Sequence, residues 1–296
     1  MKTLTIILIG TLGCVSLLQA GPGDAGAAFL KIPVDARICA LGEAGAASVD
    51  GAAALYYNPA GLSRISKVSV LFMHNSWIAG MYHEYFAAGF RIKKFGVLGL
   101  SFNYAGSGTL PRVTIRGDTI GEFSASDWTL GLGYSRDFGS LLVGAGLKYL
   151  NEKNDSFSSS AFGADLGAIY DLPIKGLQAG LSWCNLGTSI KLDQEPFPLP
   201  WLLRLGWRYG FKDLSVCQDF LFSNAATAGI GLGAEYRLAQ ILALRLGYRT
   251  GPSYEGLSGL RAGLGIALGT FGLDYAYAPY GKIGTSHRFT LSFTLK

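Results

Sequence analysis

The chain has 296 residues, of which 49% are hydrophobic and only 15% charged; its formal net charge is +5 and its mean hydropathy +0.30. This composition excludes a disordered protein, which needs few apolar residues and many charges, and 42 glycines disfavour a helical bundle. No apolar run after residue 18 reaches the roughly 20 residues of a membrane-spanning helix, so a transmembrane β-barrel is the leading fold class.

Residues 1–20 are predicted to be a secretory signal peptide. Lys2 precedes an apolar run that ends at Leu18, and Leu18-Gln19-Ala20 is an acceptable cleavage site. A membrane-anchored helix and a lipoprotein cysteine at Cys14 are the alternatives. The three cysteines that would remain match no zinc or redox motif, so we expect neither a metal nor a cofactor.

Residues 21–66 are rich in alanine and glycine and lack strand-like alternation. Asp50 is predicted to N-cap a short helix over 51–57, and Pro59 should end that helix at Asn58. An apolar segment of this length would be insoluble as a free tail. We therefore expect a hatch or plug over residues 21–66 that lies in the lumen of a barrel formed by residues 67–296.

From Lys67 onward, apolar residues alternate with small or polar ones, as Leu98, Leu100 and Phe102 do with Gly99 and Ser101. This period of two is typical of strands, and its repetition over segments of about ten residues is typical of transmembrane barrels. The pattern predicts strands at 68–77, 81–91, 95–105, 127–136, 141–150, 160–171, 176–185, 200–209, 213–222, 226–237, 241–249, 259–268, 271–278 and 285–295. These make fourteen antiparallel strands, an even number, as bacterial outer-membrane barrels have.

The predicted connections differ between the two rims. Those after even-numbered strands are all short, whereas those after odd-numbered strands include the long stretches 106–126, 151–159, 186–199, 250–258 and 279–284; only 78–80 and 223–225 break the pattern. Short turns on the periplasmic rim and longer loops on the outer rim are typical of outer-membrane barrels. The tripeptide Arg116–Asp118 lies inside 106–126 and is better explained as a hairpin turn than as an adhesion motif.

The alternation also assigns residues to the lumen. The inward-facing charged residues are mostly arginines, which a polar lumen tolerates and lipid does not. The candidates for ligand binding in the lumen are Arg204, Arg208, Arg237, Arg245, Arg249, Arg261 and Arg288, and the inward acids and lysine are Lys148, Asp165, Asp219, Glu235 and Asp274. Many other inward positions are glycine, which either lets a second backbone approach closely or eases the curvature of the barrel.

Two stretches resemble a known family. They are residues 28–37 (AFLKIPVDAR) and 54–62 (ALYYNPAGL), with the glycine-rich stretch 42–47 between them. They resemble the PorV/PorQ family within the FadL-like group of outer-membrane proteins. The resemblance implies a fourteen-stranded barrel whose N-terminal hatch carries an Asn-Pro-Ala element, which would be Asn58, Pro59 and Ala60 here, followed by Gly61 and Leu62. The chain departs from the family at 41–45, where a Gly-Met-Gly-Gly-like stretch is common.

The predicted function is therefore transport or binding of a hydrophobic small molecule across the bacterial outer membrane, with Asn58–Leu62 gating the lumen. The alternative is a PorV-like role in type IX secretion, in which the outer loops receive a secreted protein. Expected partners are outer-membrane lipid, the barrel-assembly machinery, and either the small ligand or the secreted protein. Nucleic acid is not expected because no basic cluster is present. No enzyme activity is expected, because no nucleophile-elbow spacing and no complete dinucleotide fingerprint occur.

Overall fold

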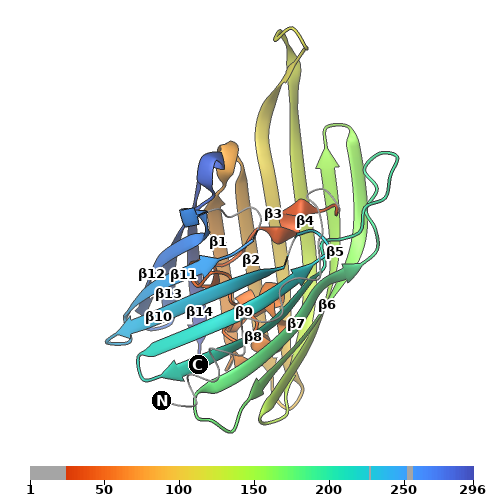
Figure 1. Cartoon of the computed structure of the whole chain (residues 1–296). Coiled ribbons are helices and arrows are strands. Elements are labelled where there is room, and N and C mark those ends of the chain that lie inside the picture. Colours follow the sequence, from red (N-terminus) through yellow and green to blue (C-terminus); the bar gives the residue numbers. More distant parts are fainter. Residues whose placement is uncertain (1–24, 227, 252–255) are drawn as a thin grey trace.

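The computed structural model describes residues 25–226, 228–251 and 256–296, and the predicted signal peptide lies outside these ranges. The strands form one closed antiparallel barrel in which each strand pairs with its neighbours in sequence and β1 pairs with β14 (Figure 1). The strands are β1 Val68–Ser76, β2 Tyr82–Ile92, β3 Gly96–Val113, β4 Thr119–Asp137, β5 Leu141–Asn154, β6 Phe157–Asp171, β7 Leu177–Gly187, β8 Leu202–Phe211, β9 Leu214–Ser223, β10 Gly229–Leu238, β11 Leu242–Arg249, β12 Leu260–Leu268, β13 Phe271–Pro279 and β14 Thr285–Leu295. The prediction of a fourteen-stranded antiparallel barrel is confirmed.

The outer face of the barrel is apolar because the pleat sends alternate side chains outward. Leu130 and Leu132 on β4 are 52% and 69% exposed, whereas Thr129 before them and Gly133 after them are buried. Aromatic pairs flank this face, with Trp128 and Tyr149 toward one rim and Phe95 and Tyr134 toward the other. An apolar band between aromatic girdles is the surface that a lipid bilayer covers. Among the described residues, no helix is long and apolar enough to cross a membrane.

The two rims differ as the sequence predicts. We call the rim with the connections after β2, β4, β6, β8, β10 and β12 the short-turn rim, and the opposite one the long-loop rim. Two stretches predicted as long loops are nevertheless largely strand. β3 and β4 continue their pairing as far as Val113↔Thr119, and β5 and β6 pair as far as Asn154↔Phe157. The prediction of loops over the whole of 106–126 and 151–159 was therefore wrong, because backbone pairing in a hairpin continues beyond the barrel wall without needing an apolar face. The hairpin turn predicted at Arg116–Asp118 is confirmed, since these residues lie in the turn between β3 and β4.

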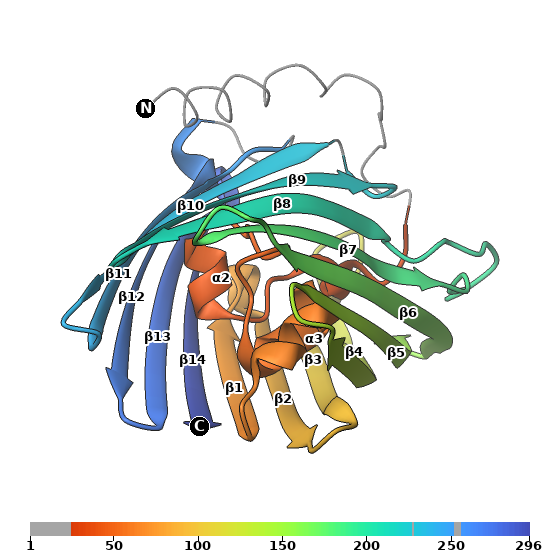
Figure 2. The ribbon, with the colours of Figure 1, turned by 90° about the horizontal axis from the view of Figure 1, so that it is seen from below.

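Residues 26–65 lie inside the ring of strands (Figure 2). They form short helical turns joined by extended backbone: η1 Ala28–Lys31, α2 Ala36–Ala40, η2 Gly51–Ala53, α3 Ala54–Tyr57 and η3 Pro59–Arg64. Further 3-10 turns occur on the long-loop rim: η4 Ile78–Gly80, η5 Gly256–Gly259 and η6 Gly281–Ile283. We call residues 26–65 the inner segment. Helix α2 packs against β11 to β14, and η3 packs against β3 to β6, so the inner segment touches opposite parts of the wall.

Close approach of the inner segment to the wall depends on glycines at particular wall positions. A Cβ at Gly180 on β7 would lie 2.2 Å from the carbonyl oxygen of Ala46, and one at Gly144 on β5 would lie 2.4 Å from the carbonyl carbon of Pro59. Real side chains do not tolerate such distances. Glycine at these positions therefore lets a second backbone lie directly on the wall.

The predicted helix cap at Asp50 needs correction. Asp50 precedes η2 with extended backbone, but its side chain accepts no hydrogen bond from the turn. Its carboxylate instead forms an ion pair with Arg37, with 3.3 Å between Oδ2 and Nη1. The helical run does end at Asn58, whose backbone is extended, as Pro59 requires.

Candidate functional site

A cavity of about 600 Å³ lies between the inner segment and the long-loop rim. We call it the outer cavity. Its walls are mainly apolar and aromatic, and its apolar lining includes Phe29, Leu30, Ile32, Trp77, Tyr82 and Leu202. Sites for small organic molecules commonly enclose about 300–1,000 Å³ and combine such walls with a few polar groups. The outer cavity therefore has the size and lining of a small-molecule site.

Two of the arginines predicted to face the lumen, Arg204 and Arg249, line the outer cavity together with Glu43. Arg204 is only 2% exposed, and its Nη1 donates to the carbonyl oxygen of Glu43 at 2.9 Å. The carboxylate of Glu43 lies 3.7 Å from the Nε of Arg249. Buried Glu43 Oε1 and Arg204 Nε have no hydrogen-bond partner in the described part of the chain. This side of the cavity thus offers hydrogen-bonding groups that the protein itself leaves unused.

The turn at Gly42 and Glu43 places this carboxylate. Both residues have left-handed backbone, with φ of 66° and 64°. A Cβ at Gly42 would lie 2.4 Å from the carbonyl oxygen of Leu232, so the backbone of the turn lies in direct contact with β10. Left-handed backbone is uncommon for a glutamate and is retained only where the surroundings enforce it. The fold here holds Glu43 in place against Arg249.

Asn58, the first residue of the predicted gating element, is completely buried and ties the inner segment to the wall. Its Nδ2 donates to the carbonyl oxygens of Ala46, Ala168 and Leu181 at 2.6, 3.2 and 3.2 Å. Its Oδ1 accepts from the backbone N–H of Ala60 at 3.1 Å and so caps η3. One amide therefore joins two parts of the inner segment to β6 and β7.

The rest of the predicted gating element, residues 59–62, is equally buried. Pro59 and Ala60 lie against Gly144, and Leu62 belongs to a hydrophobic cluster that includes Leu55 and Ile65. The element lies beneath the outer cavity and contributes nothing to its lining. This packing fills the lumen next to β3 to β6.

A cluster of ion pairs lies on the opposite side of the inner segment. Glu235 accepts from Arg37 at 3.0 Å, from Arg245 at 2.6 Å and from Arg237 at 2.9 Å, and Arg245 also bonds Asp274 at 2.6 Å. We call these side chains, with Asp50, the Glu235 cluster. Arg237 and Arg245 were predicted to bind a ligand in the lumen; in the structure they hold Glu235 instead of lining the outer cavity.

The remaining predicted arginines have other surroundings. Arg288 is completely buried and donates to the Cys39 sulfur at 2.7 Å. Arg261 donates to the backbone carbonyls of Ser258, Leu260 and Pro279, and its guanidinium lies 5.0 Å from the ring centroid of Tyr280. Arg208 is half-buried near Gln178, with 3.5 Å between Nη1 and Oε1. None of these three lines the outer cavity.

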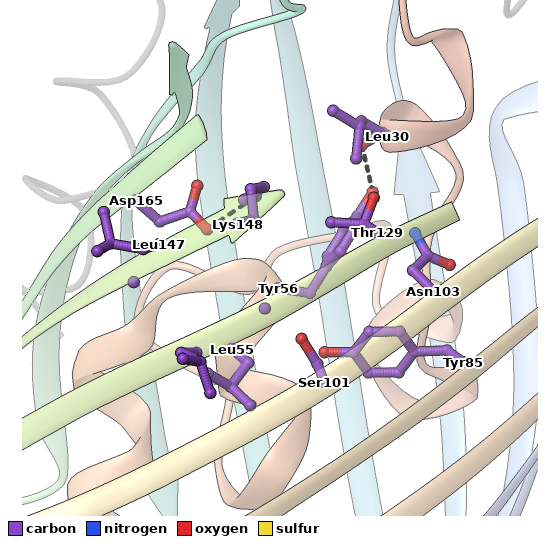
Figure 3. A pocket seen from close by; sticks show the side chains of 13 residues that line it. Leu30, Leu55, Tyr56, Tyr85, Ser101, Asn103, Thr129, Leu147, Lys148 and Asp165 are labelled. Carbon is purple, nitrogen blue, oxygen red and sulfur yellow. Dashed lines mark hydrogen bonds and ion pairs between the residues drawn. The ribbon is translucent and has the colours of Figure 1, made fainter. Parts of the chain in front are cut away.

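A second, much smaller void of about 30 Å³ lies between the inner segment and the wall formed by β2 to β6 (Figure 3). It is room for about one water molecule. Leu30 lines both this void and the outer cavity, so η1 separates them. The hydroxyl of Tyr56 donates to the carbonyl oxygens of Leu30 and Ile32 at 2.7 and 2.9 Å. Burial raises the pKa of Tyr56, which keeps this hydroxyl protonated as a donor.

Metal and thiol chemistry receive no support from the described residues, in which no three His, Cys, Asp or Glu side chains are grouped to hold a metal ion. Cys39, Cys184 and Cys217 are buried free thiols. His83 faces inward and bonds Asn103, whereas His74 and His287 lie on exposed surface.

The comparisons with known proteins give the fold. Neither a protein-family model nor a curated protein matches the sequence. Among solved structures, the chain is similar to the Ralstonia pickettii toluene transporter TbuX, with a TM-score of 0.62 and 16% identity over 89% of this chain and 98% of that one. The Pseudomonas putida toluene transporter TodX gives 0.64 and 12% identity over 89% and 98%. A Pseudomonas aeruginosa FadL homologue gives 0.58 and 12% identity over 88% and 98%.

The chain has the fold of the FadL-type outer-membrane barrels. That fold, together with the apolar band around it, is the architecture of a bacterial outer-membrane protein. Two of the similar structures are described as toluene transporters. The narrower resemblance to PorV/PorQ remains a prediction.

Several residues of the site have no clear signal in the sequence. Glu43 precedes an alanine- and glycine-rich stretch and looks like a surface residue, and Tyr56 looks like one of two adjacent core tyrosines. Asp127 lies at the start of a predicted strand and also lines the outer cavity. Glu43 and Asp127 come to line one cavity because the closed barrel encloses the inner segment.

Proposed function

We propose that the protein carries a small, largely apolar molecule across the outer membrane. The observation that supports this proposal most strongly is the outer cavity, which opens beside the long-loop rim and ends at the inner segment. A molecule entering there would bury its apolar part against Phe29 and Trp77. Arg204 and Arg249 would face its polar or anionic end.

In this proposal the inner segment acts as the gate. Below the outer cavity the inner segment is closely packed against the wall, with a void of only about 30 Å³ beside Tyr56, so we expect a ligand to advance when the segment shifts. Residues Asn58–Leu62 are the part we expect to control this shift, since Asn58 bonds both the wall and the segment. The size of the outer cavity favours a small molecule over a folded protein as its occupant.

The proposal is tested by binding in the outer cavity. Native mass spectrometry of the full chain, released from mild detergent after incubation with toluene or decanol, should show a discrete ligand-sized mass addition. Ala105→Trp would place a large ring at a lining position on β3 and should abolish the addition. Leu98→Trp, at an exposed outer position on the same strand, is the matched control and should retain it. A protein-sized addition, or none, would contradict the proposal.

A further inference from the structure

The charged side chains of the outer cavity differ between its two sides. Asp127 lines it from β4, whereas Arg204 and Arg249 line it from β8 and β11, with the single carboxylate of Glu43 beside them. In the ring of fourteen strands, β4 and β11 are seven positions apart and therefore lie on opposite sides (Figure 2). Two guanidinium groups against one carboxylate leave the side with Arg204 and Arg249 net positive, and we call it the basic wall; the side with Asp127 is the acidic wall, and apolar residues line the space between them.

The acidic wall holds two carboxylates side by side. Asp127 is the direct cross-strand partner of Glu152, and both face inward, since Glu152 Oε2 accepts from the backbone N–H of Ala27 at 3.2 Å. Like charges in directly opposite positions repel each other. No ion pair reaches either carboxylate from the residues that the structure describes. A cationic group in the cavity would relieve this repulsion.

The basic wall is incompletely bonded as well. Arg204, almost fully buried, donates to a neutral carbonyl oxygen, and its Nε has no hydrogen bond within the described ranges. Asp219 on β9 also attracts Arg204, but its carboxylate accepts from Ala46 N–H at 2.8 Å and does not line the cavity. Lys31 lines the cavity too, at an exposed position on η1. An anionic group beside Arg204 would accept hydrogen bonds from the guanidinium N–H groups that the described part of the protein leaves unbonded.

We propose that the outer cavity selects a dipolar amphipathic molecule with a cationic group and an anionic group at opposite ends of an apolar body. This inference rests on the proposed function and names its substrate class. The cationic end lies against Asp127 and Glu152, and the anionic end lies against Arg204 and Arg249. A purely apolar ligand would cover these charges without pairing them, and burying unpaired charge is costly.

The test compares four probes with the same alkyl body. These are 12-aminododecanoic acid, dodecanoic acid, dodecylamine and dodecanol, titrated at neutral pH against the full chain held in amphipol, with binding followed by tryptophan fluorescence. Trp77 lines the cavity and serves as the reporter. The amino acid should bind about tenfold more tightly than any of the other three, which corresponds to roughly 1.4 kcal/mol.

Single substitutions test which wall binds each end of the ligand. Asp127→Asn should make the amino acid bind no better than dodecanoic acid, and Arg204→Gln should make it bind no better than dodecylamine. Asp155→Asn, in the exposed turn between β5 and β6, and Arg237→Gln, in the Glu235 cluster, are the matched controls. Both should keep the tighter binding of the amino acid. Equal binding of all four probes would overturn the inference and leave the proposed function standing. Failure of every probe to bind would count against the proposed function itself.

Discussion

At the scale of single residues, Asn58 connects the inner segment to the wall through hydrogen bonds to β6 and β7. Asn58→Ala removes the donor to three carbonyl oxygens, and a buried group left unsatisfied costs about 1–3 kcal/mol. Hydrogen exchange should speed up for residues 46–62 and stay slow in the barrel strands. Asn151→Ala, whose bonds run only between β5 and β6, is the control. Unchanged exchange in residues 46–62 would contradict this role.

Asp35 makes the docking of the inner segment depend on pH. Its carboxylate caps α2, and burial, followed by the nearby charge of Asp274, raises its pKa from 3.8 to about 6. The docked state therefore holds the proton more tightly than the undocked one. Stability contributed by this proton is present below about pH 4 and is lost as the pH rises through 6.

Asp35→Asn should remove that pH dependence while keeping a good N-cap residue. Between pH 4 and 7, protection of residues 36–40 from hydrogen exchange should fall in the unmodified chain and stay nearly constant in the variant. A fall of the same size in both proteins would show that Asp35 is not the titrating group.

At the scale of elements, docking of the inner segment depends on glycines in the wall. Gly180→Ala would force a Cβ to within 2.2 Å of Ala46 oxygen and should expose the inner segment to limited proteolysis. Gly146→Ala is the matched control, since its Cβ would meet nothing closer than 3.5 Å. Both variants should still migrate as folded barrels in unheated gels. Equal protease resistance of the two would contradict the close-approach argument.

The hairpin formed by the outer halves of β3 and β4 should be dispensable for barrel formation. Beyond Gly106 the strand β3 has no partner in β2, and pairing of β4 with β5 begins only at Ala125. Replacing residues 108–123 by a short turn should leave the thermal unfolding midpoint within a few degrees of its original value. A large fall in that midpoint would mean that the hairpin supports the barrel.

The sequence allows much of the fold to be predicted but little of the site. Outward-facing residues such as Leu130 and Leu132 occupy every second position of a strand. Because these positions face lipid, they must be apolar, and the sequence therefore shows a period of two. The lumen has no such regularity. Arg204 and Arg245 occupy equivalent inward positions, yet one lines the cavity and the other holds Glu235. Their difference comes from where the inner segment lies, which no local pattern encodes.

At the scale of the whole molecule, the lumen of the barrel contains the inner segment, and the outer cavity lies between that segment and the long-loop rim. The Glu235 cluster, the Asn58 amide and the wall glycines all hold that segment in place. The molecule should therefore behave as a closed barrel toward ions and as a conduit toward ligands that fit the outer cavity.

The most direct test is uptake into vesicles whose outer leaflet is lipopolysaccharide, a layer that slows apolar solutes. With the full chain inserted, a radiolabelled ligand identified by the binding experiments should enter faster than in protein-free vesicles, while chloride and potassium should not. Ala105→Trp should reduce the rate to the protein-free value, and Leu98→Trp should not. Uptake no faster than without protein, or equally fast passage of ions, would contradict a gated conduit for small amphipathic or apolar molecules.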